Sequence, residues 1–441
     1  MNIVDIINKK RKNIELNDEE IKYAIEGYVA NKIEDYQMSA LLMAICLNGM
    51  TDHETAVLTE VMYKSGDIIN LDKIKSTKVD KHSTGGVGDK TTLILLPLVA
   101  SCGVVAPKMS GRGLGFTGGT IDKLESIPGF NTKLDINDFM EQVNEIGVAI
   151  ASQTGNLVPA DKKIYALRDV TGTVESIPLI ASSIMSKKLA SGADTIVIDL
   201  KVGNGALMKD YESAKKLAET MVNIGKSHNR QVICVLTDMN QPLGCAIGNS
   251  LEVKESIDVL NNRGPKDITN LIIALATIMV SCGLGISFEE ANKKVHDNLN
   301  NGNAYVKFLE LVKKQGGRIE ELGFAKNVVS IKSKLSGYIN EIKTDDLGEI
   351  SRKLGGGRYE KNDEINFGVG LVLSKKLGDY VMEDEEILKV YFDDKSVSVD
   401  EILKCFKIET NKINSNPLIY EVIKWLLLKK CFGYIHYHFY F

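Results

Sequence analysis

The sequence predicts a protein of the α/β class, with a small helical part, a larger α/β part on a mostly parallel sheet, and a C-terminal α+β lobe. Residues 1 to about 65 contain helix caps and an apolar run of helix length. From about residue 77, β-rich runs alternate with helical stretches, the pattern of a parallel sheet covered by helices. After about residue 330, short strands and a glycine turn indicate an α+β lobe.

The N-terminal part is predicted to be helical from its caps. Asn17 precedes three acidic residues at the expected start of one helix. Met38–Leu47 is apolar enough for a buried helix, and Thr51-Asp-His-Glu54 has the pattern of a capping box. These residues therefore form a small helical unit.

The middle of the chain alternates between strands and helices. Helices are expected over residues 160–190 and 211–224, and strands over 148–151, 195–200 and 231–237. Ligands of such a sheet bind at the carboxyl ends of its strands. In the C-terminal lobe we expect strands over 328–334, 336–342, 369–374 and 387–392, with a glycine turn at 354–358. Residues 425–441 are aromatic and apolar, too short and too charged for a membrane span, and are interpreted as an atypical tail.

Composition excludes several classes of protein. The 441 residues suffice for roughly two or three domains, and 25% charged with 44% hydrophobic residues is ordinary for a globular protein. A net charge of −4 without a basic stripe argues against nucleic acid as a partner. No signal peptide and no run of about 18 apolar residues is found, which predicts no membrane association. The seven cysteines lack a C-x-x-C pair, and the six histidines lack a metal-ligand pattern, so we expect a cytoplasmic protein with reduced thiols.

The chemistry is concentrated in Lys81–Glu125, which contains two glycine-rich loops. The loops are Ser83–Asp89 and Ser110–Gly119, separated by a predicted helix over Thr91–Cys102 and a short strand at 104–105. Glycine lets successive backbone N–H groups approach a ligand, and a following helix N-terminus favours an anion. Hydroxyl groups in both loops and one lysine beside the first indicate a phosphate held on several sides.

Simpler explanations of these loops have to be weighed. Glycine-rich loops after strands are often only tight turns. A P-loop requires glycine directly before its lysine, but Asp89 stands before Lys90. Gly113, Gly115 and Gly118 match G-x-G-x-x-G, a weak signal in a run so rich in glycine.

Read whole, the second loop and its helix, SGRGLGFTGGTIDKLE, resemble the signature of the thymidine and pyrimidine-nucleoside phosphorylases. KHSTGGVGD at 81–89 is similar to the phosphate loop of that family, and the resemblance continues to about Ile423. It implies a discontinuous helical domain, a cleft active site and a homodimer formed through the helical domain. The implied domains are 1–65 with 160–192 (helical), 66–159 with 193–330 (α/β), and 331–424 (C-terminal lobe), followed by the 425–441 tail.

The resemblance implies reversible phosphorolysis of uridine, thymidine and deoxyuridine to the free base and (deoxy)ribose 1-phosphate. Inorganic phosphate would be the co-substrate, and no organic cofactor is expected. By motif position, the implied phosphate-binding residues are Lys81, Ser83, Thr92, Lys108, Ser110 and Thr120. Lysine at position 108 is also typical of the broader pyrimidine-nucleoside enzymes, so we expect it to bear on the choice between uridine and thymidine.

The base site is implied in the same way. Arg168, Ser183 and Lys187 match the base-binding segments, and Ser183 and Lys187 would share one face of a helix. His82 is the candidate hydrogen-bond donor or proton source for a base oxygen, so the implied catalytic residues are His82, Lys187 and Arg168. Leu114 and Ile180 would supply apolar walls.

A potassium ion is also implied, at Gly88, Lys90, Leu243, Ala246 and Glu255. Carbonyl oxygens and one carboxylate suit a hard cation. Two positions depart from the family: Lys90 stands where threonine is common, and Phe116 where histidine is usual. A backbone contact at residue 90 would survive the change, whereas a hydroxyl contact would not.

Two other functions compete with this interpretation. A phosphoribosyltransferase of the anthranilate type shares this architecture but needs a magnesium-binding acidic pair, and Asp199 and Asp210 are far apart in the sequence. A nucleoside-binding relative without activity is the second alternative, suggested by Phe116, Lys90 and the tail. The retained lysines, arginine and histidine of the motifs argue against it.

Overall fold

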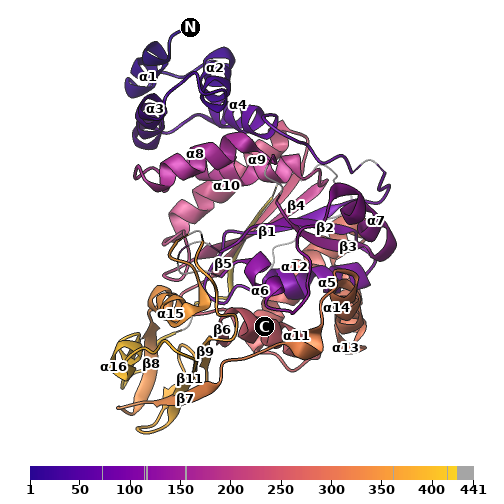
Figure 1. Cartoon of the computed structure of the whole chain (residues 1–441), viewed down its shortest axis with the longest axis vertical. Coiled ribbons are helices and arrows are strands. Elements are labelled where there is room, and N and C mark those ends of the chain that lie inside the picture. The colour runs from indigo at the N-terminus through magenta and orange to yellow at the C-terminus, as the bar shows by residue number, and fades with distance from the viewer. Residues whose placement is uncertain are drawn as a thin grey trace.

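The computed structural model describes residues 1–71, 73–113, 115, 118–153, 156–360, 362–414 and 416–424. Three regions follow one another along the long axis of the molecule: helices at one end, a sheet with its covering helices in the middle, and a strand-rich lobe at the other end (Figure 1). The predicted fold class, α/β with a helical part and a C-terminal α+β lobe, is confirmed. The exact domain boundaries stay a prediction.

The helical region is built from two separate stretches of the chain. Its helices are α1 (Ile3–Arg11), α2 (Asp18–Val29), α3 (Asp35–Asn48), α4 (Asp52–Tyr63), α8 (Pro159–Asp169) and α9 (Ile177–Ala190). Helix α9 packs on α4, and α8 packs on α2, α3 and α4. The two caps predicted from sequence are confirmed as capping boxes, Asn17 with Glu20 and Thr51 with Glu54.

The central sheet has the strand order β1-β4-β5-β13. Its strands are β1 (Val79–Ser83), β4 (Thr195–Val202), β5 (Gln231–Asp238) and β13 (Ile419–Lys424). The first three are parallel, and β13 is antiparallel to β5. Residues 419–424 therefore join this sheet, which corrects their assignment to the C-terminal lobe. The rest of the tail prediction, residues 425–441, lies outside the described residues.

A second parallel pair lies beside β1. It consists of β2 (Ala106–Ser110) and β3 (Val148–Ser152), and a bridge between Lys78 and Val105 joins it to the start of β1. The strand expected at 104–105 thus begins at Ala106. The second glycine-rich loop consequently starts directly at the carboxyl end of β2, as the first does at that of β1.

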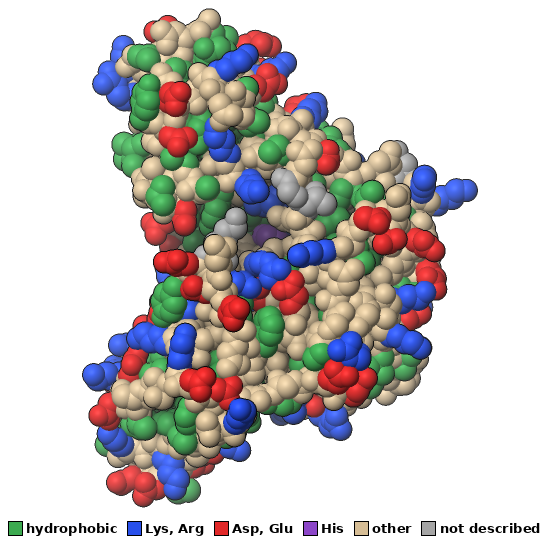
Figure 2. Space-filling view, in the orientation of Figure 1, with side chains coloured by type: hydrophobic (Ala, Val, Ile, Leu, Met, Phe, Trp, Pro, Cys, Tyr) green, Lys and Arg blue, Asp and Glu red, His purple; other side chains and the backbone are tan. Residues whose placement is uncertain are grey.

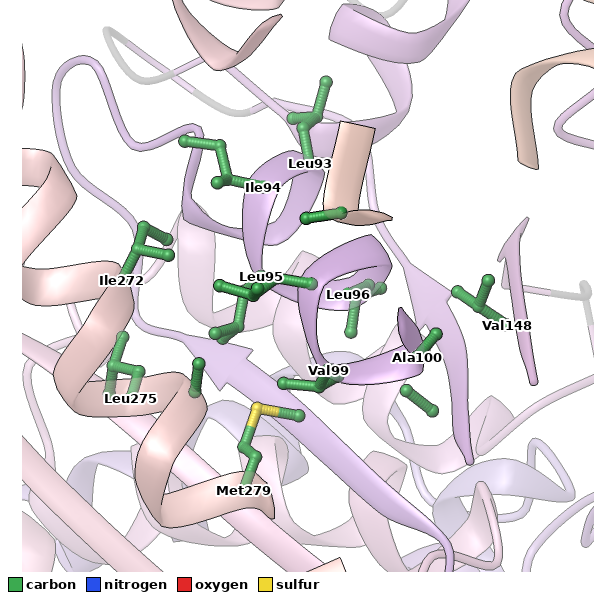
Figure 3. Close-up of a cluster of buried hydrophobic side chains, with 14 of the residues drawn as sticks. Leu93, Ile94, Leu95, Leu96, Val99, Ala100, Val148, Ile272, Leu275 and Met279 are labelled. Atoms are coloured by element: carbon green, nitrogen blue, oxygen red, sulfur yellow. The ribbon is translucent and has the colours of Figure 1, made fainter. Parts of the chain in front are cut away.

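Helices cover both faces of the central sheet. Helices α10 (Tyr211–Ser227) and α12 (Lys266–Leu284) contact its strands directly. The other helices of the region are α5 (Thr91–Ser101), α6 (Thr120–Glu125), α7 (Ile136–Ile146), α11 (Asn249–Leu260), α13 (Phe288–Asn300) and α14 (Asn303–Lys314). Side chains of α5, including Leu95 and Val99, pack against Leu275 and Met279 of α12 in a fully buried core (Figure 3). Helix α5 is apolar on every side because other elements surround it.

Helix α12 is long and apolar enough to cross a membrane by length and composition. In this fold, 67% of its apolar window is buried inside the protein. Its apolar residues pack on α5, α13 and the central sheet, as expected of a core helix.

The C-terminal lobe contains β7 (Asn327–Lys332), β8 (Gly337–Ile342), α15 (Thr344–Ser351), β9 (Gly370–Leu373), β10 (Tyr380–Val381), β11 (Glu386–Phe392), α16 (Val399–Leu403) and β12 (Phe406–Glu409). All four strands expected there are present. A two-residue strand from the α/β region, β6 (Ala246–Ile247), pairs with β9. The lobe and the α/β region therefore share one sheet, next to the positions implied for a potassium ion.

Candidate active site

The surface is hollowed between the helical region and the α/β region, and lysine or arginine side chains and one histidine side chain gather in the hollow (Figure 2). Strand β1 supplies residues to it. Successive side chains of a strand point to opposite faces, so Lys81 and Ser83 share one face while Asp80 and His82 share the other. Lys81 donates to Thr91 of α5, and Asp80 meets Lys188 of α9, the Asp80 Oδ2 lying 2.7 Å from the Lys188 Nζ.

On the first face, the glycine-rich loop leads into the N-terminus of α5. The Gly85 N–H donates to the Ser83 Oγ at 3.2 Å, and the Thr91 hydroxyl donates to the Asp89 carboxylate at 2.6 Å. The ammonium group of Lys81 donates to the Thr91 hydroxyl. Thr92 follows in the first turn of α5. Backbone N–H groups, hydroxyls and a cation thus converge at one helix N-terminus, a geometry suited to phosphate.

The charges beneath this loop are balanced. Lys81 is fully buried and lies 3.8 Å from the Asp199 carboxylate, which also lies 2.8 Å from the Lys201 Nζ. Burial raises the pKa of Asp89, but the ammonium groups of Lys81, Lys201 and Lys123 outweigh it and hold that pKa well below its usual range. The pKa of Lys81 is lowered because burial outweighs its carboxylate neighbours. An arriving phosphate would meet a preformed set of cations and carboxylates.

The second glycine-rich loop closes on the first. Ser110 ends β2, and Thr120 begins α6. The Lys123 Nζ donates to the Asp89 carbonyl at 2.6 Å and to the Gly118 carbonyl at 3.2 Å, and so links the two loops. A side chain at Gly119 would place its Cβ 2.0 Å from the Gly113 nitrogen, so this turn requires glycine.

On the other face of β1, Lys187 is the most accessible of the predicted base-site cations. Its Nζ donates to the Asp161 carboxylate at 2.6 Å and to the Ser183 hydroxyl at 3.1 Å, and 24% of its side chain is exposed. The shared helix face predicted for Ser183 and Lys187 is confirmed. Ile180, one turn before Ser183 on α9, is buried. Leu114 and Phe116 lie outside the described residues.

The surroundings of His82 lower its pKa. Burial, together with the ammonium groups of Lys188, Lys108 and Lys187, keeps the pKa of His82 well below its usual 6.5. A neutral imidazole offers one N–H and one acceptor nitrogen. Of the two roles expected from the sequence, the lowered pKa favours hydrogen-bond donor over proton source, and the role of His82 stays a prediction.

Arg168 does not face the hollow as a free cation. Its side chain is buried, and its Nε, Nη1 and Nη2 donate to the carbonyls of Thr173, Leu179 and Val174 at 3.1, 3.1 and 2.7 Å. The guanidinium joins the segment after α8 to the first turn of α9. These carbonyls take three of the five N–H donors of the guanidinium, and a direct contact between Arg168 and a base stays a prediction.

Lys108 is likewise engaged within the protein. Its Nζ lies 3.2 Å from the Asp80 Oδ1 and donates to the Lys81 carbonyl, so Asp80 bridges Lys108 and Lys188. Burial lowers the pKa of Lys108 despite the Asp80 carboxylate.

The positions implied for potassium do come together, but the Lys90 side chain lies among them. Its Nζ donates to the Leu243 carbonyl at 2.7 Å, to the Ala246 carbonyl at 3.0 Å and to the Glu255 carboxylate. Burial lowers the pKa of Lys90, yet Glu255 and Glu252 outweigh burial and the net shift is upward. The residues present do not fit a potassium ion, because an ammonium group takes the same oxygens. The expected role of Lys90 as a ligand is corrected accordingly.

Sequence reasoning missed several residues that build this site. Asp80, Lys123 and Asp161 hold the side chains or loops that were predicted, and Glu252 of α11 lies 2.8 Å from the Lys123 Nζ. One signal was present: β1 carries the polar residues Asp80, Lys81 and His82 within a strand whose neighbours are buried. Such a strand indicates a site rather than a core.

Asp199 and Asp210, the two acidic residues weighed for a magnesium-binding pair, make other contacts. Asp199 accepts from the Thr237 hydroxyl at 2.7 Å and is paired with Lys201, while Asp210 caps α10 by accepting from the Ser213 N–H at 2.8 Å. Within the described part of the chain, no group of three or more His, Cys, Asp or Glu side chains could hold a metal ion.

Three family models match the chain. They are a glycosyl transferase family helical bundle domain over residues 4–66, a glycosyl transferase family a/b domain over 75–305 and a pyrimidine nucleoside phosphorylase C-terminal domain over 338–409. The crystal structure of anthranilate phosphoribosyltransferase from Thermus thermophilus has the same fold, with a TM-score of 0.58 and 16% identity over 70% of this chain and 98% of that chain. Fold and paired glycine loops thus define a glycosyl transferase with a helical bundle and an a/b domain.

Relatives of known name are similar over nearly the whole chain. Pyrimidine-nucleoside phosphorylase of Staphylococcus haemolyticus (strain JCSC1435) is 52% identical over 433 residues, 96% of this chain and 100% of the relative. That of Staphylococcus aureus (strain MSSA476) is 52% identical over 435 residues, with the same coverage. The chain belongs to the pyrimidine-nucleoside phosphorylase family.

Proposed function

We propose that the protein catalyses the reversible phosphorolysis of pyrimidine nucleosides, namely uridine, thymidine and deoxyuridine, to the free base and (deoxy)ribose 1-phosphate. The observation that carries the proposal is the pair of glycine-rich loops, each leading from a strand into a helix N-terminus and joined by Lys123. The names of relatives at 52% identity support the same reaction. Inorganic phosphate is the co-substrate, and no organic cofactor is required.

The phosphate is held between the two loops. Its ligands in this proposal are hydroxyls and backbone N–H groups of both loops, with Lys81 beneath them: Ser83, Thr92, Ser110 and Thr120. A phosphate oxygen attacks the anomeric carbon of the sugar while the bond from that carbon to the base nitrogen breaks. Holding the nucleophile in line removes much of the entropic cost of this step.

The departing base carries away the electron pair of the broken bond. The Lys187 ammonium, oriented by Asp161 and Ser183, is placed to stabilise that negative charge. The neutral His82 donates a hydrogen bond to a base oxygen, and the base takes its proton afterwards from solvent. Arg168 acts as a positioning residue, since its carbonyl bonds order the entry to α9.

An exposed apolar stripe supports a homodimer formed through the helical region. On α3, Tyr36, Met43 and Leu47 lie at helical spacing and are 73%, 38% and 76% exposed. Burying this stripe against a second copy would remove apolar area from water. Sedimentation should therefore give a dimer at micromolar concentration, and Leu47→Glu should shift it toward monomer.

The described cysteines support a reducing compartment, the cytoplasm. Six of them, Cys46, Cys102, Cys234, Cys245, Cys282 and Cys405, are unbridged. Small-molecule substrates of nucleoside salvage agree with that location. The potassium ion implied by the resemblance forms no part of this proposal, because Lys90 takes its oxygens.

The proposal is tested by following uracil release from uridine with and without phosphate. Release that requires phosphate and yields ribose 1-phosphate is the expected result, and thymidine in the same assay measures the breadth of specificity. Equal release without phosphate would indicate a hydrolase and would contradict the role assigned to both loops. Binding of uridine without release would favour an inactive relative.

A further inference from the structure

A lysine ammonium group occupies a cation site built from distant parts of the chain. Lys90 is fully buried, directly after the first glycine-rich loop, and its Nζ reaches the carbonyls of Leu243 and Ala246 and the carboxylate of Glu255. An ammonium group has three N–H donors and no acceptor. Three oxygens receive three donors, so the group is completely satisfied.

The surrounding loop leaves no room for a second cation. A Cβ at Gly244 would lie 2.2 Å from the Glu255 Oε2 and 3.1 Å from the Lys90 Nζ, so backbone packs directly on the ion pair. A Cβ at Gly88 would lie 2.8 Å from the Leu243 carbonyl oxygen. The other carboxylate oxygen of Glu255 accepts from the N–H groups of Cys245 and Ala246 at 2.9 and 3.1 Å. The carboxylate is therefore saturated from both sides.

This ion pair connects the phosphate loop to the C-terminal lobe. Lys90 immediately precedes α5, whereas Ala246 belongs to β6, which pairs with β9 of the lobe. The same helix, α11, carries Glu252 one turn before Glu255, and Glu252 pairs with Lys123, which links the two glycine-rich loops. Helix α11 thus supports both phosphate loops through two buried lysines.

We propose that the Lys90 ammonium is a covalently attached substitute for a free monovalent cation, so that this protein needs no potassium to order its phosphate loop. Lys90 is then a positioning residue, acting through the loop at 243–246. The consequence for phosphorolysis rests on the proposed function, but the cation site itself does not. Its tests therefore include readouts that need no activity.

The first test needs no variant. Thermal midpoints and phosphorolysis rates of the wild-type protein are measured in KCl, NaCl and choline chloride at equal ionic strength. Both quantities should be the same in all three salts. A saturable rise in the midpoint or rate with K⁺ over choline would overturn the proposal. Failure of phosphorolysis alone would leave the midpoint comparison valid and would count against the proposed function instead.

The second test removes the Lys90 ammonium group from the cation site. Lys90→Thr removes the ammonium and provides a hydroxyl, so its thermal midpoint should fall in choline chloride and recover saturably with KCl. Lys90→Met, of similar length but without charge or hydroxyl, should fall in every salt. Lys376→Met is the matched control, because Lys376 donates to the Gly244 carbonyl of the same loop from outside, at 2.5 Å. Any fall in its thermal midpoint, from the lost bonds to Asp267 and to the Pro242 and Gly244 carbonyls, should be the same in every salt.

Crystals of the wild type and of Lys90→Thr soaked in RbCl give a direct readout. An anomalous rubidium peak among Leu243, Ala246 and Glu255 is expected in the variant and not in the wild type. A peak there in the wild type, or equal responses of the Lys90→Thr midpoint to K⁺ and choline, would contradict the substitution of cation by lysine.

Discussion

The two faces of β1 hold charged side chains in different ways. On the phosphate face, Lys81 meets groups from the α/β region alone, and it is fully buried. On the base face, Asp80 meets Lys188 from α9, and Lys187 of the same helix stays partly exposed beside Asp161 of α8. The proposed phosphate site is therefore built mainly from the α/β region, whereas the proposed base site depends on how the helical region meets the α/β region. Changes on the two faces should affect different kinetic quantities.

The largest effect is expected at Lys187. Lys187→Met removes the cation that stabilises the leaving base and should lower kcat for uridine phosphorolysis by about 10² to 10³-fold. Phosphate KM should change little, because the phosphate face is untouched. Steady-state kinetics with phosphate and uridine varied separately measure both quantities.

Two further variants sharpen this result. Asp161→Asn keeps the lysine but loosens its orientation, so a smaller loss of about tenfold is expected. Lys163→Met, on the same helix as Asp161 but bonded to the Tyr28 carbonyl at 2.6 Å, should leave kcat near the wild-type value. Full activity of Lys187→Met would contradict the role given to the base face.

The next effect is expected on the phosphate face. Lys123→Met breaks the link between the two glycine-rich loops and should raise phosphate KM by about tenfold or more, with less change in uridine KM. It also leaves Glu252 buried without its cation, which should cost about 3–5 kcal/mol of unfolding free energy. Kinetics and thermal unfolding measure the two consequences.

The double variant Lys123→Met with Glu252→Gln separates the effect on phosphate KM from the effect on stability. Gln can still accept from the Gly248 N–H, a bond that is 3.1 Å long in the wild type, so much of the stability should return. The raised phosphate KM should remain. A double variant with normal phosphate KM would show that Lys123 acts only through stability.

A pH-dependent effect is expected at His82. Burial and the neighbouring ammonium groups hold the pKa of His82 below 6.5 in the folded protein. The unfolded chain therefore binds a proton as pH falls below 6.5 while the folded protein does not, so unfolding becomes easier in that window. His82→Gln lacks this penalty. As pH falls from about 6.5 to 5, the unfolding free energy of the variant relative to the wild type should therefore rise by up to about 1.4 kcal/mol per pH unit.

Urea unfolding of both proteins at a series of pH values measures this difference. A constant difference over that range would show that His82 titrates normally in the folded state. The wild-type kcat should in that same range show no ionisation assignable to His82. A kcat profile whose step disappears in His82→Gln would instead favour a proton-donating histidine.

The smallest effect is expected at Lys108. Lys108→Met should lower the uridine-to-thymidine ratio of kcat/KM by about tenfold or less, because Asp80 and the Lys81 carbonyl of β1 lose their bonds to the ammonium group. Because Lys108 is bonded to Asp80 and to the Lys81 carbonyl, we expect it to affect substrate choice through the position of β1 more than through direct contact with the substrate. An unchanged ratio would remove Lys108 from the specificity determinants.

Much of the fold was predictable because it depends on local sequence patterns. The caps at Asn17 and Thr51, the strands β4 and β5 and the two glycine-rich loops all occur where sequence patterns place them. Turn chemistry, caps and strand composition act over a few residues, so a single sequence contains them. The antiparallel β13 was missed because its partner β5 lies far away along the chain.

The sequence by itself determined the fold class, the positions of the two glycine-rich loops and the shared face of Ser183 and Lys187. Only the tertiary structure decided where the long cationic side chains end. Arg168 ends on backbone carbonyls, and Lys90 ends on the Leu243 carbonyl, 153 residues away. A lysine or arginine head lies several bonds from its backbone, so its partner is set by whichever buried oxygens the folded chain brings within reach.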